Sequence, residues 1–157
     1  MSLSMITSYF IQDQLSSLQN KREKLCLIIN SHLLSNMVRD LQCINIGQQL
    51  SGKLIMVPKQ ERSVQAALIF SEMIRSSTAE LVGINKLEIL FNRELAVDPL
   101  KLLLANAKEK TILALWPGHY DPKIGLTYAQ PNHPEYRFYK PSDISNLLII
   151  DIEAQIL

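Results

Sequence analysis

The stretch LCLII, from Leu25 to Ile29, holds five apolar residues in a row and lacks the alternation that marks a strand with one solvated face. A strand that is apolar on both faces is typical of a parallel sheet that helices cover on each side. Further apolar-rich runs of strand length follow along the chain: QCINI (42–46), ELVGI (80–84), TILALW (111–116) and NLLIIDI (146–152). The sequence therefore predicts a mostly parallel sheet of about five strands.

Segments with helical features separate these runs. Apolar residues recur at helical spacing from Ile6 to Leu18, and the pair Asp98-Pro99 is typical of a helix start. We expect helices over about 5–22, within 30–41, over 63–74 and over 99–110. Because strands and helices alternate, the sequence predicts an α/β fold with three layers and helices on both faces of the sheet. Residues 125–143 contain three prolines and alternating aromatics, which predicts a loop or a short hairpin.

Length and composition indicate one ordinary globular domain. Residues 1–4 could be a cloning scar ahead of a native start, or a disordered end, so we interpret residues 5–157 as the single domain. The 16 basic and 15 acidic side chains give a formal charge of +1, so bulk attraction to nucleic acid or to a membrane surface is not indicated. No stretch reaches the length of a membrane span and no signal core is evident, so we expect a cytoplasmic protein. Cys26 and Cys43 lie in apolar runs and are expected to be inert, buried thiols.

One motif suggests nucleotide binding. Gly47, Gly52 and Lys53 have the G-x-x-x-x-G-K spacing of a phosphate-binding loop. However, Leu54 replaces the hydroxyl residue that would bind magnesium, and Pro58 shortens the helix that should face the phosphates. The residues favour a turn with a solvated lysine, while an ATP or GTP loop that uses magnesium stays open as the alternative, with Asn85 as a further binding residue.

The residues that follow the other predicted strands do not suit the binding of a nucleotide or its magnesium ion. Ligands of such sheets bind beyond the carboxyl ends of the strands. After the first predicted strand, residues 30–42 contain neither glycine nor lysine. These thirteen residues are also too few to form both a phosphate loop and a helix. Asn85 is a neutral amide where an aspartate would hold magnesium. Glu88 is a lone carboxylate, and Pro117 offers no polar group. The sequence therefore predicts no catalytic residue.

The histidines and aromatics do not form a recognisable binding motif. His119 and His133 lack further ligands at any suitable spacing, so no metal site is expected. The aromatic residues between 120 and 139 have few cations among them beyond Arg137 and Lys140, which favours packing over base stacking.

Two stretches carry a family resemblance: LEILFNRELAVDPLKLLLANAKEKTILALWPG (87–118) and LTYAQPNHPEYRFY (126–139). With these the chain resembles the BrxF family, the small phosphate-loop-containing proteins of type-3 BREX (bacteriophage exclusion) systems. The resemblance implies a phosphate loop directly after the first strand and an Asp-Asn pair before the segment that begins at Leu87. Here NSHLLSN (30–36) and Asn85-Lys86 stand in those places, so the nucleotide motifs are degenerate. On the same alignment, residues 44–54 correspond to the second strand and a polar helix, not to the loop.

The resemblance implies a nucleotide-hydrolase-like fold and a role in a prokaryotic antiphage system. Because the motifs are degenerate, we expect a non-catalytic module that binds no cofactor and acts through other proteins of its operon. The amino-terminal helix and residues 126–139 are candidate contact surfaces. The side chains that we expect to contact partners are Glu88, Phe91, Trp116, Tyr128, His133, Glu135, Tyr136 and Arg137. Two alternatives stay open: a weak ATP or GTP hydrolase at Gly47, Gly52 and Lys53, and a nucleic-acid adaptor. The adaptor would use Lys21, Arg22, Lys24, Arg137 and Lys140. A homo-oligomer is also left open.

Overall fold

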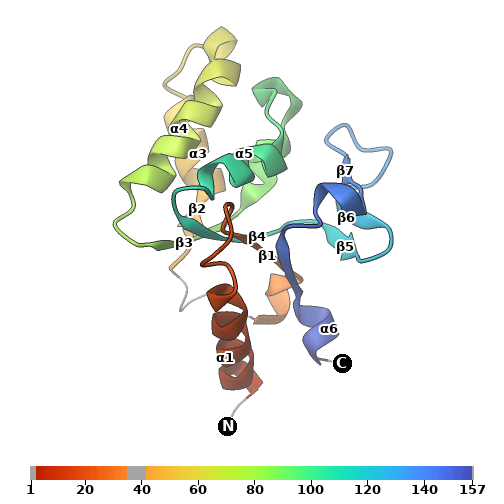
Figure 1. Cartoon of the computed structure of the whole chain (residues 1–157). Helices are drawn as coiled ribbons and strands as arrows, with labels where there is room; N and C mark the ends of the chain where they lie inside the picture. The colour runs from red at the N-terminus through yellow and green to blue at the C-terminus, as the bar shows by residue number, and fades with distance from the viewer. Residues whose placement is uncertain (1–2, 35–41, 157) are drawn as a thin grey trace.

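A five-stranded parallel sheet forms the centre of the molecule. The computed structural model describes residues 3–34 and 42–156 and is drawn in Figure 1. The strand order is β2-β3-β4-β1-β8, and every neighbouring pair is parallel. The strands are β1 (Leu25–Ile29), β2 (Ile44–Asn45), β3 (Leu81–Asn85), β4 (Thr111–Leu115) and β8 (Leu148–Asp151). The predicted α/β class and the five-stranded parallel sheet are confirmed.

Helices cover both faces of this sheet, as the sequence predicts. The helix α1 lies on one side, and α3, α4 and α5 lie on the other (Figure 1). The α-helices are α1 (Leu3–Ser16), α3 (Ile46–Leu54), α4 (Arg62–Ser76), α5 (Pro99–Asn106) and α6 (Ile152–Ile156). Short 3₁₀ helices connect them: η1 (Ser31–Leu34), η2 (Lys59–Glu61), η3 (Leu87–Phe91), η4 (Arg93–Leu95) and η5 (Pro141–Asp143). Within the described ranges no helix is long and apolar enough to cross a membrane.

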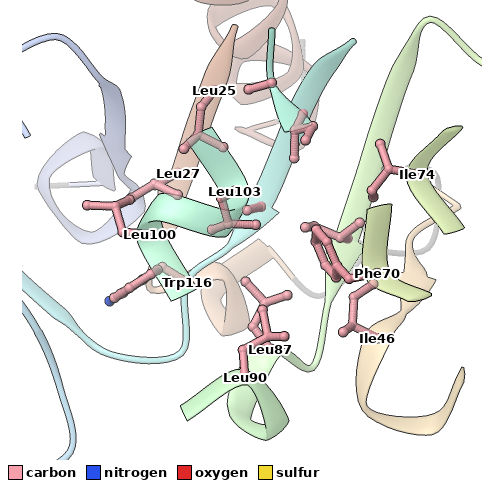
Figure 2. Packing of buried hydrophobic residues seen from close by; sticks show 14 of the residues in the cluster. Leu25, Leu27, Ile46, Phe70, Ile74, Leu87, Leu90, Leu100, Leu103 and Trp116 are labelled. Atoms are coloured by element: carbon pink, nitrogen blue, oxygen red, sulfur yellow. The ribbon is translucent and has the colours of Figure 1, made fainter. Parts of the chain in front are cut away.

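The strand β1 shows why the run LCLII has no polar position. Leu25, Leu27 and Ile29 pack in the larger core with α3, α4 and α5, part of which Figure 2 shows. Cys26 and Ile28 point to the other face and pack in the core that includes α1. Because successive side chains of a strand alternate between the faces, a strand covered on both sides must be apolar throughout. Burial raises the pKa of Cys26 to about 12, which agrees with the predicted inert thiol.

A small antiparallel sheet lies beside the main one. It consists of β5 (His119–Asp121), β6 (Gly125–Tyr128) and β7 (Arg137–Tyr139), in that order. The hairpin β6–β7 confirms the short hairpin predicted within 125–143. The sequence did not predict β5, because its three residues are too few to give a periodic pattern.

Several predicted boundaries were wrong. The first helix begins at Leu3, so Leu3 and Ser4 belong to the fold, and it ends at Ser16 instead of residue 22. Its end coincides with local bonds in which the hydroxyls of Ser16 and Ser17 donate to nearby backbone carbonyls. The second strand has only two residues, Ile44 and Asn45, because Gln42 has a φ of 43°, which an extended strand does not allow.

Two predicted helices also differ in extent. The helix α5 ends at Asn106 instead of residue 110. The carbonyl of Ala107 accepts a bond from the backbone N–H of Lys24, which ties this end to the start of β1. Of the short helix expected within 30–41, residues Ser31 to Leu34 form η1, and 35–41 lie outside the described residues.

Candidate functional site

Two carboxylate side chains near the carboxyl terminus, those of Asp151 and Glu153, bind the residue that follows β1. Asn30 follows the strand with a φ of 59°, in the left-handed region. Its Nδ2 donates to Oδ1 of Asp151 at 2.9 Å and to Oε2 of Glu153 at 3.3 Å. The strand β8 brings Asp151 there, because Ile29 and Asp151 are register partners. Two carboxylates therefore lie at the strand end where a phosphate loop would hold phosphates.

The predicted turn at Gly47, Gly52 and Lys53 is wrong, because all three residues lie inside the helix α3. Asn45 caps this helix by accepting the N–H of Gln48 at 2.9 Å. A Cβ on Gly47 would lie 3.2 Å from the carbonyl oxygen of Lys86, so this glycine permits a close approach. Gly52 faces open space. The helix directs these N–H groups along its axis instead of around an anion.

The end of β3 also differs from a magnesium site. Asn85 is the register partner of Asn45, and its Oδ1 is buried without a hydrogen-bond partner. The next residue, Lys86, has a φ of 54°. Among the described residues, no group of three or more His, Cys, Asp or Glu side chains could hold a metal ion.

Three of the predicted contact residues form an aromatic cluster. The rings of Phe91 and Tyr128 are stacked with centroids 3.8 Å apart, and Trp116 meets Phe91 edge-on at 5.4 Å. The Nε1–H of Trp116 donates to the carbonyl of Thr127 at 3.0 Å. Phe91 and Trp116 are each only 3% exposed. Both side chains therefore join the small sheet to the main one and offer almost no surface to a partner.

Asp98 connects the small sheet to α5. Its Oδ1 caps the helix by accepting the N–H groups of Leu100 and Lys101 at 3.1 and 3.3 Å. The same oxygen accepts the hydroxyl of Tyr139 at 2.8 Å. Oδ2 of Asp98 lies 3.6 Å from Nη1 of Arg137, and Nη2 of Arg137 donates to the carbonyl of Val97 at 3.0 Å. Arg137 is thus largely committed to holding the fold.

Most of the other predicted contact residues, but not Glu88, line a cavity of about 440 Å³ between η3–η4 and the β6–β7 loop. His133, Glu135, Tyr136 and Arg137 line it from the loop, and Arg93, which the sequence did not suggest, lines it from η4. The loop is held by its own bonds, since Nδ1 of His133 accepts the N–H of Glu135 at 3.0 Å. The sequence reasoning therefore selected most of one wall of this cavity.

Two carboxylates lie near the ring of Tyr128. Burial raises the pKa of Tyr128, and the charges of Glu135 and Glu88 raise it further. Glu88 and Glu135 therefore both act on the ring that covers Phe91, although 47 positions separate them in the chain (135 minus 88). Glu88 is exposed and Glu135 is half-buried, so both are accessible to a binding partner.

The sequence reasoning missed the closure at β1. The sequence analysis places Asp151 only in the last strand and gives Glu153 no role, because their distance along the chain from Asn30 leaves no local pattern. The Asp98-Pro99 helix start was recognised, but the bond from Tyr139 to Asp98 was not.

Fold and site together define the chain as an α/β protein with a parallel five-stranded sheet and a small antiparallel sheet docked against it. At the end of β1, Asn30 is hydrogen-bonded to Asp151 and Glu153. Comparison with family models, with curated proteins and with solved structures found no match to this chain.

Proposed function

We propose that the chain is a non-catalytic binding module with a nucleotide-hydrolase-like fold, which serves a prokaryotic antiphage system of the type-3 BREX kind through protein partners. The resemblance of residues 87–118 and 126–139 to the BrxF family suggests the system. The proposal that the chain is non-catalytic rests on the contact of Asn30 with Asp151 and Glu153 at the end of β1.

The strand order supports the nucleotide-hydrolase-like part of this proposal. It differs from the orders 3-2-1-4-5-6 of dinucleotide-binding folds and 2-1-3-4-5 of flavodoxin-like folds. The strand β4 separates β1 from β3. One large class of nucleotide hydrolases places a strand in the same way, between the phosphate-loop strand and the strand that ends in the magnesium-binding aspartate.

Electrostatics support the absence of a nucleotide. A triphosphate at the end of β1 would need converging N–H groups and a lysine, whereas Asn30 offers its amide to two carboxylates. Repulsion between two unit charges 4 Å apart ranges from about 1 kcal/mol in water to about 4 kcal/mol near a protein surface. The carboxylates of Asp151 and Glu153 would therefore oppose phosphate at this place.

The contact surface that we propose for partners is the cavity beside η4 together with its rim. His133 is exposed there, and Tyr136 lines the cavity. Glu88 is also exposed and acts on the adjacent ring of Tyr128. The aromatic cluster beneath it is not itself a contact surface, because Phe91 and Trp116 are buried and support the rim from below.

Copurification tests the proposal. The tagged full chain is expressed with the other products of its operon, as wild type and with Tyr136→Ala or Glu135→Lys. We expect a specific protein to copurify with the wild type and to be lost with the variants, while Lys108→Glu in the exposed turn after α5 has no effect. A chain that retains no operon product would contradict the proposal.

Calorimetry with magnesium-ATP separates the alternatives. We expect no binding, because α3 provides no phosphate loop. Micromolar binding that Lys53→Ala abolishes would instead support the ATP or GTP hydrolase. If the chain is instead a nucleic-acid adaptor, its affinity for nucleic acid should fall steeply as salt is added.

A further inference from the structure

A second cavity lies on the other side of η4. Its volume is about 480 Å³, and Asn92 lines both this cavity and the one described above. Its walls come from α3, from the junction of η2 and α4, and from η3–η4, so it lies past the carboxyl ends of β2 and β3. We call it the α3–η4 groove; its walls include Leu54, Ile55, Lys59, Arg62, Ile89 and Leu95. None of the partner-contact residues proposed above lines it.

The rim of the α3–η4 groove presents large apolar side chains to water. Ile55 is 72% exposed and the adjacent Met56 is 83% exposed. The backbone that carries them is fixed, because the N–H of Ile55 donates to the carbonyl of Ser51 at 3.0 Å. Nε of Arg62 donates to the carbonyl of Val57 at 3.0 Å and ties the turn to α4. Ile55 and Met56 are therefore held in a preorganised position, as in protein contact sites.

The charge at the α3–η4 groove is mainly positive. Lys59 and Arg62 face one carboxylate, that of Glu94. In the part of the chain that the structure describes, neither cation takes part in an ion pair, since the pair of Arg137 with Asp98 is the one found there. The neutral polar groups are already in use: Ser51 Oγ donates to the carbonyl of Gly47, and Asn92 Oδ1 accepts the N–H of Glu94.

We propose that the α3–η4 groove binds a segment of a partner protein in which a large apolar side chain lies beside aspartate or glutamate residues. The apolar side chain enters between Leu54, Ile89 and Leu95, with Ile55 and Met56 covering it. The carboxylates meet Lys59 and Arg62. This inference goes beyond the proposed function, because it uses a separate surface and holds whether or not the chain belongs to a defence system.

Peptide selection on the full chain tests this inference. A library of random 12-residue peptides displayed on phage is selected on the wild type and counter-selected on Ile55→Asp. We expect the enriched peptides to share one large apolar residue flanked by aspartate or glutamate. Synthetic copies should shift the backbone amide signals of Ser51, Ile55 and Ile89 in NMR spectra of the full chain.

Matched variants give the quantitative test. We expect Lys59→Glu to weaken binding of the synthetic peptides at least about tenfold. Leu68→Asp is the control, because Leu68 is an apolar side chain of α4 that is 59% exposed and does not line the groove. It should leave the affinity unchanged.

Four results would overturn the inference. The first is that no peptide is enriched on the wild type relative to Ile55→Asp, and the second is that basic peptides are enriched. The third is that the peptides shift the NMR signals of His133 and Tyr136 instead of those of the groove. The fourth is that the wild type self-associates and that Ile55→Asp abolishes this association. The last result would make a second copy of the chain the occupant. The copurification and ATP experiments test the proposed function independently of the α3–η4 groove. Failure of the proposed function can therefore be distinguished from failure of the groove proposal.

Discussion

The hydroxyl of Tyr139 donates a hydrogen bond of 2.8 Å to Oδ1 of Asp98, across 41 positions of the chain. Because Asp98 also caps α5, this bond ties β7 of the small sheet to the start of a helix on the main sheet. Burial raises the pKa of the Tyr139 hydroxyl, and the bond to Asp98 raises it further. This part-buried bond therefore helps to hold the small sheet, whose β6–β7 loop lines the cavity beside η4.

Tyr139→Phe should destabilise the protein by about 1–2 kcal/mol, because it removes a hydrogen bond to a charged group while keeping the ring. Urea unfolding at pH 7 measures the change. The control is Tyr120→Phe, which removes a hydroxyl that has no hydrogen-bond partner among the described residues. Equal stability losses for the two variants would contradict the assigned role of Tyr139.

The stabilising effect of Tyr139 should depend on pH in one direction. Its pKa in the folded state lies above that of an unfolded tyrosine, which is about 10. The contribution is therefore complete below pH 10 and is lost as the pH rises above it. We expect the stability difference between the wild type and Tyr139→Phe to shrink as the pH rises from about 10 to about 11. Cys26 is common to both proteins and cancels; a difference that stays constant would contradict this prediction.

Lys110 should stabilise the carboxyl-terminal end of α4. Its Nζ donates to the carbonyls of Ile74 and Arg75 at 3.1 and 3.3 Å, and also to that of Ser77. A cation at this end of a helix also interacts favourably with the helix dipole. Lys110→Met should cost about 1–2 kcal/mol and lower Tm by several degrees. Lys108→Met is the exposed control and should leave Tm nearly unchanged.

Asn30→Asp should destabilise the closed end of β1 by about 1–3 kcal/mol at pH 7, because it places a third carboxylate beside Asp151 and Glu153. The repulsion should be relieved as the pH falls and the carboxylates become protonated. Asn30→Gly is the control: it removes the same side chain but suits the φ of 59°. Denaturant unfolding at pH 7 and at low pH measures both. A pH-independent loss in Asn30→Asp would contradict the proximity of these three groups.

Gly52→Ala should raise stability by about 0.5–1 kcal/mol, because Gly52 lies inside α3 and a Cβ there meets nothing within 4 Å. Gly118→Ala should have the opposite effect, since its Cβ would overlap the carbonyl oxygen of Thr127. We expect a loss of about 2 kcal/mol there. Thermal unfolding of both variants measures the contrast. Destabilisation by Gly52→Ala would indicate that this glycine adopts a loop conformation after all.

Short-range features of the chain were predicted well where their cause is local. The runs at Leu25 and Thr111 are strands because continuous apolar sequence suits a strand that is covered on both faces. The helix at Pro99 begins where predicted, because Asp98 caps it through neighbouring N–H groups. The predictions failed where nearby residues gave an ambiguous signal: the glycines around Lys53 suggested a turn, yet burial of Leu50 and Leu54 accompanies a helix there.

The candidate site was predictable only in part. His133, Glu135 and Tyr136 come from one continuous loop, so a single stretch of sequence identifies one wall of the cavity. Its other wall comes from η3–η4, and no sequence pattern pairs that segment with the loop.

Local order along the chain was enough to predict the class of fold, the number of parallel strands and the cap at Asp98, because strand and helix formation depend on neighbouring residues. Which side chains meet was settled by strand order and register. Asp151 reaches Asn30 because β8 pairs with β1, with Ile29 opposite Asp151, although 121 positions separate the two side chains. The physical reason is that such a contact depends on how the whole sheet assembles, and a five-residue apolar run is compatible with many neighbours.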